Sequence, residues 1–280
     1  ESAKVYTDLG FSRIILGRET PLDEIKEIRD YLPKIEIEAF VHGAMCIAYS
    51  GRCFLSKEMS DRSANQGDCA HSCRWNYRVL EEKQRPGEYM PVTQGENFIT
   101  IMSSKDMCLI DHLDKFKEAG VDSLKIEGRM KSIYYTAVVT RAYRKMIDSL
   151  EGRTIENIEG FREELFKVSH REFSTGFYFG KEEMDEVTKT SYEREYTFLG
   201  SVGKQVGSDK YDLIVKNQIR TENAIEYIGP DVLFLKDSNY SLFDKDGEKV
   251  IKADHGKVYT LETDVPVKEG YILRKKTSTV

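Results

Sequence analysis

The 280-residue sequence has a single tryptophan, only 6 prolines, no cysteine after Cys108 and no apolar run near the roughly 18 residues of a membrane-spanning helix. The scarcity of proline excludes collagen-like and proline-rich disordered chains, and 40% hydrophobic residues can form a substantial core. Positive charge is not in excess either. The net charge of −6 argues against nucleic-acid binding by overall charge, although a local basic patch could still bind RNA.

The first residues, Glu1-Ser2-Ala3-Lys4, lack the basic and apolar regions of a signal peptide, so we expect a cytoplasmic protein. Position 1 is not Met, and the opening residues have the pattern of the end of a helix. Both features suggest a fragment of a longer chain.

The cysteines are confined to one region. Four of the five follow the spacing C-x6-C-x15-C-x3-C, at Cys46, Cys53, Cys69 and Cys73. Disulfides are a poor explanation in a reducing compartment, so metal ligation is favoured. Only the last two form a zinc-type pair, whereas iron-sulfur clusters accept more varied spacings, which favours a cluster over zinc or unligated thiols. Cys108 stands apart and is expected to be a small buried residue, with a reserve role as a ligand.

Strands and helices alternate over residues 1–150. The sequence predicts four strands, at 13–19, 35–40, 98–102 and 123–127, and helices at 20–32, 106–119 and 133–150. Such alternation predicts a parallel sheet with crossover helices, and four such strands make half of a (β/α)8 TIM-like barrel. An insertion at 43–96 holds four of the five cysteines, at the strand end where barrel enzymes place their chemistry.

Residues 195–280 have a different pattern, which predicts a small all-β barrel after a polar linker at 151–194. Short apolar runs separated by Gly, Asp, Asn and Pro predict strands at 196–202, 212–216, 224–228, 232–235, 258–261 and 271–273. The predicted fold class is therefore α/β plus all-β.

Several spaced motifs occur along the chain. The second predicted strand reads Glu38-x-Phe40-x-x-Gly43-x-x-Cys46, followed by Gly51-x-Cys53-x-x-Ser56. Further motifs are Gln66-Gly67-x-Cys69-x-x-x-Cys73-Arg74-Trp75, Ser103-Ser104-Lys105-Asp106, Ser123-Leu124-Lys125-Ile126-Glu127-Gly128-Arg129-x-Lys131-Ser132 and Thr175-Gly176-Phe177. Together they resemble the collagenase-like peptidase family of unassigned catalytic type, whose better-understood members are tRNA and ubiquinone hydroxylation proteins. Cys73 with Arg74-Trp75 resembles its tRNA branch.

The resemblance implies a cytosolic protein that promotes prephenate-dependent 5-hydroxylation of the wobble uridine of tRNA. It also implies a four-iron four-sulfur cluster with Cys46, Cys53, Cys69 and Cys73 as its ligands. Similar family members carry an N-terminal half-barrel that is absent here, which puts the activity of this fragment alone in question. The exposed flank of a half-barrel should be apolar, so we expect it to bind the missing half or to form a homodimer.

Three charged residues, Glu38, Glu127 and Arg129, fall at or just beyond the carboxyl ends of predicted strands, where barrel enzymes bind substrates, and are the candidate catalytic residues. An ion pair that closes the barrel is the alternative for the last two. Arg129, Lys131 and Arg18 could engage carboxylates, of which prephenate carries two. For Lys131, solvated surface charge is the default.

For RNA, the stretch Arg74-Trp75-Asn76-Tyr77-Arg78 interleaves cations and aromatic rings, as base-stacking surfaces do. Trp75 could instead shield a cluster from water. The basic run 274–276 could meet phosphates or be a solvated terminus. A noncatalytic RNA-binding module is therefore one alternative function.

A collagenase-like peptidase is the other alternative function. The sequence contains neither a His-Glu-x-x-His helix nor a Gly-x-Ser-x-Gly elbow, the motifs of two large hydrolase classes. His42 lies four residues before Cys46, so a Cys-His pair, or a zinc site of this histidine with three cysteines, is conceivable. A partly buried loop residue is the more common role of such a histidine.

Overall fold

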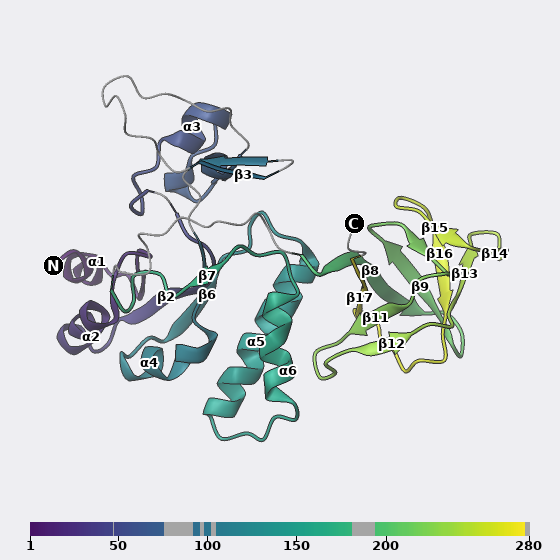
Figure 1. The fold of residues 1–280 in the computed structure, drawn as a ribbon. Coiled ribbons are helices and arrows are strands. Elements are labelled where there is room, and N and C mark those ends of the chain that lie inside the picture. Colours follow the sequence, from purple (N-terminus) through teal and green to yellow (C-terminus); the bar gives the residue numbers. More distant parts are fainter. Residues whose placement is uncertain (47, 76–91, 96–97, 102–104, 181–193, 278–280) are drawn as a thin grey trace. The chain divides into compact units, whose positions relative to one another are not determined.

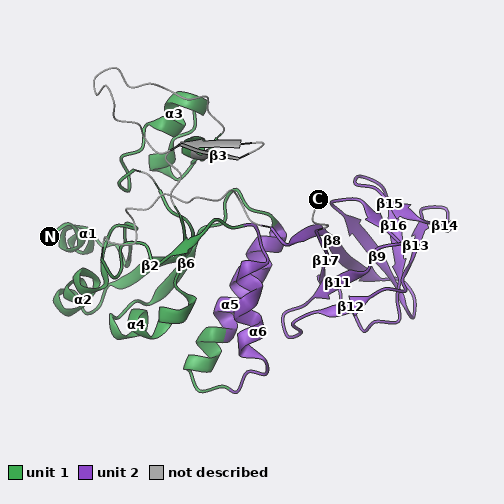
Figure 2. Cartoon of the chain, in the orientation of Figure 1, with its two compact units in different colours: residues 1–132, 146–153, 170–193 green, residues 133–145, 154–169, 194–280 purple. Residues whose placement is uncertain are grey.

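The structure, a computed structural model, describes residues 1–46, 48–75, 92–95, 98–101, 105–180 and 194–277 (Figure 1). The chain divides into two compact units (Figure 2). Unit 1 comprises Glu1–Ser132, Met146–Arg153 and His170–Glu193, and unit 2 comprises Ile133–Lys145, Thr154–Ser169 and Arg194–Val280. Within the described ranges, no helix combines the length and the apolar character needed to span a membrane.

Unit 1 is built on a mixed sheet of five strands. They are β1 (Arg13–Ile15), β2 (Glu36–Ala44), β5 (Asp106–Cys108), β6 (Ser123–Ile126) and β7 (Phe173–Ser174). β2 runs parallel to β1 and β6, and its last residues, from His42 to Ala44, pair antiparallel with β5. β7 runs parallel to β5. The mixed α/β character of this unit agrees with the sequence, but the antiparallel β2–β5 pair contradicts the predicted all-parallel arrangement.

β2 is the central strand, which pairs with β1, β5 and β6. Ile37, Ala39 and Val41 alternate along it and are completely buried, and His42 is completely buried as well, as expected for a strand covered on both sides. Helix α2 (Leu22–Tyr31) precedes it and follows Pro21, with Asp23 and Glu24 in its first turn, where acidic groups favour the positive end of the helix dipole.

The other helices of the chain are α1 (Ser2–Asp8), α3 (Leu55–Ser60), α4 (Leu113–Glu118), α5 (Ile133–Leu150) and α6 (Ile158–Glu163).

Two predicted elements between residues 98 and 119 are wrong in part. The strand at 98–102 exists as β4 (Phe98–Ile101), but it pairs antiparallel with β3 (Val92–Gly95) in a separate hairpin. The helix predicted from 106 begins only at Leu113. Asp106 lies in β5, where its N–H donates to the carbonyl of Glu172 (2.9 Å) and its carboxylate accepts from the N–H of Arg171 (3.2 Å). These distant pairings override the local helix signal.

Unit 2 contains an antiparallel sheet of eight strands, in the order β12-β11-β17-β8-β9-β16-β13-β14, and a two-stranded pair, β10-β15. Its strands are β8 (Tyr196–Gln205), β9 (Lys210–Val215), β10 (Ile219–Arg220), β11 (Ile225–Ile228), β12 (Leu235–Asp237), β13 (Ser241–Asp244), β14 (Lys249–Val250), β15 (Lys252–Ala253), β16 (Tyr259–Glu262) and β17 (Ile272–Lys276). Inward-facing residues such as Leu199, Leu213 and Leu261 form its core. The described part of residues 195–280 therefore consists of strands and the turns between them, as the sequence predicts.

Residues 151–180 differ from the predicted polar linker. Helix α6 buries Phe161 in unit 2, while β7 joins the sheet of unit 1. The first thirteen residues of α5 also belong to unit 2, because Arg141 donates to the carbonyls of Gly229 (2.9 Å) and Val232 (2.7 Å). The rest of the predicted linker, 181–193, lies outside the described residues.

Candidate functional site

The four spaced cysteines line a single cavity of about 490 Å³ in unit 1. Cys46 follows the end of β2, Cys53 precedes α3, and Cys69 and Cys73 lie in the segment after α3. The remaining lining residues are Ile15, Arg18, Phe40, Ala44, Met45, Tyr49, Ser50, Gly51, Ala64, Asn65, Gly67, His71, Lys125, Glu127 and Arg129. The cavity therefore combines four thiols with three cationic side chains, Arg18, Lys125 and Arg129.

Local hydrogen bonds hold the cysteine-bearing segments together. The side chain of Asn65 accepts a hydrogen bond from the N–H of Cys53 (2.8 Å). The hydroxyl of Ser56, which is buried, accepts one from the N–H of Ala70 (3.0 Å). The first contact ties the segment before α3 to the segment after it, and the second ties α3 itself to that later segment, so thiols far apart in sequence face one cavity.

The electrostatics of the thiols depend on burial and on one another. Burial raises the pKa of the Cys46 thiol, and the neighbouring Cys53 and Cys69 raise it further, whereas Arg18 acts in the opposite direction. The N–H of His71 donates to the sulfur of Cys69 (3.3 Å). Several thiolates would repel one another here unless cations neutralise them, and a bound metal group supplies such charge.

The residues present fit an iron-sulfur cluster in chemical type, because four thiols surround one cavity and thiolates are the usual cluster ligands. A single zinc ion needs thiolates about 2.3 Å from one metal centre. Among the described residues, no three Cys, His, Asp or Glu side chains are grouped closely enough to hold one ion.

Charged residues line the same cavity as the thiols. Arg18 lies with its guanidinium carbon 3.8 Å from the centre of the Phe40 ring and pairs with Glu127 at 3.4 Å. Its Nε is buried and has no hydrogen-bond partner among the described residues. The carbonyl of Phe40 accepts a hydrogen bond from the hydroxyl of Tyr178 (2.7 Å), which fixes the strand beneath the ring. Arg18 is thus preorganised, with donor capacity left for an anion.

Glu127 reaches the cavity because of a glycine. Gly43 has φ of 106°, and a Cβ built on it would lie 2.3 Å from the carbonyl oxygen of Glu127. Only a residue without a side chain allows this approach. The N–H of Glu127 then donates to the carbonyl of His42 (2.8 Å), and its carboxylate accepts from the N–H of Arg129 (2.9 Å). The sequence offered an ion pair of Glu127 with Arg129 as the alternative role, and the structure shows an ion pair of Glu127 with the side chain of Arg18.

Two predicted site residues lie elsewhere. Because β2 extends to Ala44, Glu38 lies near the start of the strand rather than at its carboxyl end. It is buried and pairs with Lys125 (2.7 Å) and Arg13 (3.1 Å). Burial opposes ionisation, yet hydrogen bonds from Lys125 and Ser123 hold the pKa of Glu38 below its usual value. Lys131 is half-buried and is not among the residues that line the cavity.

His42 and Cys108 are not among the residues that line the cavity. They are opposite each other in the β2–β5 pair. His42 is completely buried, with its ring 5.4 Å from that of Phe173, and burial lowers its pKa to about 3. The arrangement does not bring His42 to Cys46 as a catalytic pair would require.

Of the RNA candidates, Trp75 is 40% exposed, and its indole N–H donates to the carbonyl of Ala70 (3.3 Å). The side chain of Arg74 and residues 76–78 lie outside the described part of the structure. In the basic run 274–276, Lys276 is exposed, whereas Arg274 is completely buried and donates a hydrogen bond to Glu164 (2.6 Å).

The comparison with known families agrees with these motifs. Residues 1–188 match peptidase family U32, and residues 194–274 match the C-terminal domain of that family. The chain belongs to peptidase family U32. The resemblance drawn from the cysteine-rich motifs is thereby confirmed.

Individual U32 relatives have different names. The chain is 36% identical to tRNA hydroxylation protein P of Escherichia coli, with 82% of this chain and 59% of that protein covered. It is 37% identical to tRNA hydroxylation protein P1 of Bacillus subtilis, with 91% and 61% covered. A protein named collagenase from Porphyromonas gingivalis is 36% identical over 60% of this chain and 42% of its own length. The chain thus spans about three fifths of the length of the two tRNA hydroxylation proteins.

The lining residues of the U32 cavity that sequence reasoning did not assign to the site include Lys125, Phe40 and His71. A signal for the first was present, since Lys125 and Glu127 are two residues apart around the end of β6 and so share a face. His71 adopts φ of 54°, a backbone conformation that non-glycine residues seldom adopt and that no residue pattern here predicts.

Proposed function

We propose that the four-cysteine cavity is the hydroxylation site of a tRNA-modifying enzyme. The observation that carries the proposal is the convergence of Cys46, Cys53, Cys69 and Cys73 on one cavity that is also lined by cationic side chains. The similarity to two proteins named for tRNA hydroxylation, over more than four fifths of this chain, supports the same reaction class. A tRNA substrate would place the protein in the cytoplasm, as the sequence predicts.

The four cysteines would hold a four-iron four-sulfur cluster, with zinc as the alternative metal. When bound, such a cluster supplies thiolate-ligated iron whose reduction potential depends on nearby charge, hydrogen bonds and solvent. The chain contributes a hydrogen bond to the sulfur of Cys69 and the nearby positive charge of Arg18. Cys108, which does not line the cavity, would not be a ligand.

The cationic side chains of the cavity would bind the co-substrate prephenate through its two carboxylates. Arg18 and Arg129 both line the cavity, and a guanidinium offers paired donors that match a carboxylate. Glu127 holds Arg18 from one side and Phe40 supports its face, so the donor fork is oriented before the anion arrives. Lys125 adds a third cation. In this proposal Glu127 positions Arg18, and Glu38 stabilises the sheet.

We also infer that the α/β unit is part of a (β/α)8 barrel. β1 and β6 both run parallel to β2, and α2 and α5 follow strands as crossover helices do. The additional length of the relatives supports further barrel segments in the full protein.

Mass spectrometry of tRNA nucleosides tests the proposed function. A strain without the protein, and without a redundant route, should lose 5-hydroxyuridine derivatives and regain them with the full-length gene. Unchanged nucleosides in that strain would refute a hydroxylation role. The purified protein should also fail to cleave collagen or gelatin peptides, because the proposed role of the thiols is to ligate a metal group rather than to act as a nucleophile; cleavage that depends on Cys46 would favour a peptidase instead.

A further inference from the structure

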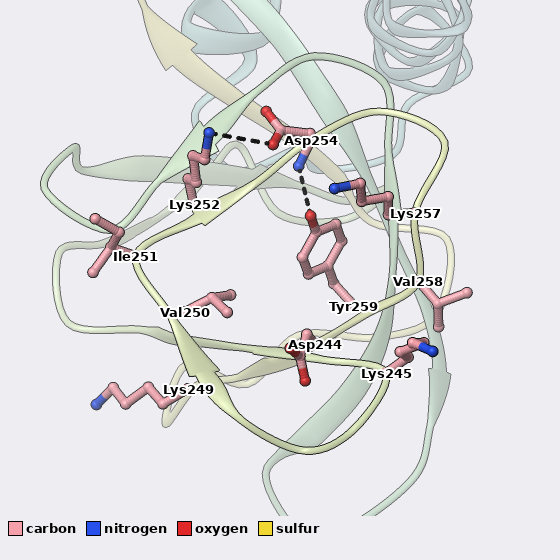
Figure 3. A pocket seen from close by; sticks show the side chains of 10 residues that line it. All are labelled: Asp244, Lys245, Lys249, Val250, Ile251, Lys252, Asp254, Lys257, Val258 and Tyr259. Atoms are coloured by element: carbon pink, nitrogen blue, oxygen red, sulfur yellow. Dashed lines mark hydrogen bonds and ion pairs between the residues drawn. The ribbon is translucent and has the colours of Figure 1, made fainter.

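The β-rich part of unit 2 contains a hollow that the four-cysteine site does not involve. It has a volume of about 780 Å³ and lies among β13, β14, β15 and β16 and the turns that connect them (Figure 3). Its lining residues are Asp244, Lys245, Lys249, Val250, Ile251, Lys252, Asp254, Lys257, Val258 and Tyr259. We refer to it as the lysine hollow.

Both carboxylates of the hollow are already engaged by the protein. Asp244 accepts hydrogen bonds from the N–H groups of Asp246 and Glu248, each at 3.0 Å. Asp254 accepts one from the side chain of Gln218 (2.7 Å) and pairs with Lys252 at 3.6 Å (Figure 3). Both carboxylates therefore stabilise the turns that connect the strands.

More lysines than aspartates line the hollow. Two of the lysines, Lys249 and Lys257, account for the difference. Lys245 has Asp246 as a partner at 3.8 Å. Within the described residues, Lys249 and Lys257 have no ion pair within 4 Å. They project from opposite sides of the hollow (Figure 3). Among the described residues, this face of a chain whose net charge is −6 thus presents two lysine ammonium groups that form no ion pair.

Apolar side chains border the same lysines. Ile251 is 78% exposed, more than any other large apolar side chain in the described part of the chain, and Val258 is 69% exposed. Val250 lies between them (Figure 3). Tyr259 is buried, and its hydroxyl accepts a hydrogen bond from the N–H of Asp254 (3.1 Å), so the wall is fixed. Exposed apolar surface rimmed by polar groups is typical of a binding surface.

We propose that the lysine hollow binds tRNA, with Lys249 and Lys257 on backbone phosphates and Ile251 and Val258 against ribose or base surfaces. The inference rests on the proposed function, which supplies the RNA substrate. In RNA, negatively charged phosphates lie next to bases that offer apolar faces. Lysines outside ion pairs, next to exposed apolar side chains, can therefore contact both parts of an RNA strand. An acidic protein partner would contact the lysines alone.

The experiment measures the affinity of the full-length protein for a tRNA transcript by fluorescence anisotropy between about 50 and about 200 mM salt. The test variant is Lys249→Glu with Lys257→Glu. The control is Lys216→Glu with Lys236→Glu, which makes the same change of charge at exposed lysines of the same sheet outside the hollow. The test variant should bind at least about tenfold more weakly, and the slope of log affinity against log salt should fall by about 1.4, because each single-strand phosphate contact contributes about 0.7. The control should bind within about twofold of wild type.

A third variant, Ile251→Ser, should weaken binding while leaving the salt slope unchanged, because it removes apolar contact but no charge. Equal loss of affinity in the test and control variants would refute the hollow, since overall charge would then explain the effect. Unchanged tRNA binding in the test variant, combined with loss of an acidic protein from co-purification, would also refute it.

The nucleoside measurement separates the two proposals. If 5-hydroxyuridine disappears when the gene is deleted but the test variant binds tRNA normally, the proposal that the lysine hollow binds tRNA is wrong and the proposed function stands. If the nucleosides persist on deletion while the test variant loses tRNA binding, the hollow stands and the proposed function is wrong. Absence of tRNA binding by wild type refutes the hollow directly.

Discussion

Arg274 should be a main determinant of the stability of unit 2. Its side chain is completely buried, and it donates to both carboxylate oxygens of Glu164, at 2.6 and 3.0 Å. It also donates to Glu226 (2.8 Å) and to the hydroxyl of Tyr134 (3.1 Å). Burial alone would raise the pKa of Glu164, but the hydrogen bonds from Arg274 hold that pKa below its usual value. The two charges therefore depend on each other.

Replacement of Arg274 by Met keeps an apolar stem but leaves Glu164 charged and buried. Removal of one partner from a buried pair typically costs about 3–5 kcal/mol. We expect the lower end, about 3 kcal/mol, because Glu164 keeps Lys167 at 2.8 Å and Arg141 at 3.4 Å. Lys276→Met, an exposed change two residues away, should stay within about 0.5 kcal/mol of wild type.

Urea unfolding with two probes makes the measurement specific to one unit. Trp75, the single tryptophan, lies in unit 1, so its fluorescence should report a nearly unchanged transition. The unfolding transition of unit 2, followed by far-ultraviolet circular dichroism, should move to a lower urea concentration. Adding Glu164→Leu to Arg274→Met should recover part of the loss, because no unpaired carboxylate then remains. An Arg274→Met protein within about 1 kcal/mol of wild type would refute the reasoning.

Three further outcomes are expected. Anaerobically purified full-length protein should contain iron and sulfide, which Cys46→Ala, Cys53→Ala, Cys69→Ala and Cys73→Ala lose and Cys108→Ala retains; stoichiometric zinc without sulfide would contradict this. The free energy of unfolding should fall as pH drops below about 6.5, by at most about 1.4 kcal/mol per pH unit from His42, because its folded pKa is about 3 and the unfolded chain binds the extra proton; His42→Gln should flatten that slope, and an unchanged slope would refute it. Arg18→Lys should raise the KM for prephenate by at least about tenfold, since lysine keeps the charge but loses the donor fork, whereas Arg153→Lys, an exposed change, should not.

Local patterns predicted much of the fold because they report burial directly. The helix at 133–150 matches α5 at both ends, and the strands at 196–202 and 258–261 overlap β8 and β16. β13, β14 and β15 were not predicted, because charged residues interrupt their short apolar pattern. Long-range pairing, as at Asp106, leaves no trace in local periodicity, and this explains the wrong helix start.

The candidate site was predictable where a rare residue type was involved. The confined cysteines indicated one site, and all four line one cavity. Residue type alone did not distinguish Glu127 from Glu38. The first lines the cavity, whereas the second forms ion pairs near the start of β2. Likewise, Arg274 looked like a terminal basic residue, because its partner Glu164 lies 110 positions away in sequence.

The most direct test of the central claim is the 5-hydroxyuridine content of tRNA from a strain whose only copy of the protein carries Cys46→Ala, compared with Cys108→Ala and wild type. Folding of each protein is checked by the Trp75 unfolding transition, and tRNA binding by anisotropy. If the four-cysteine cavity is the hydroxylation site, a folded, tRNA-binding Cys46→Ala protein leaves 5-hydroxyuridine absent, while Cys108→Ala restores it fully. Full restoration by Cys46→Ala would contradict the account.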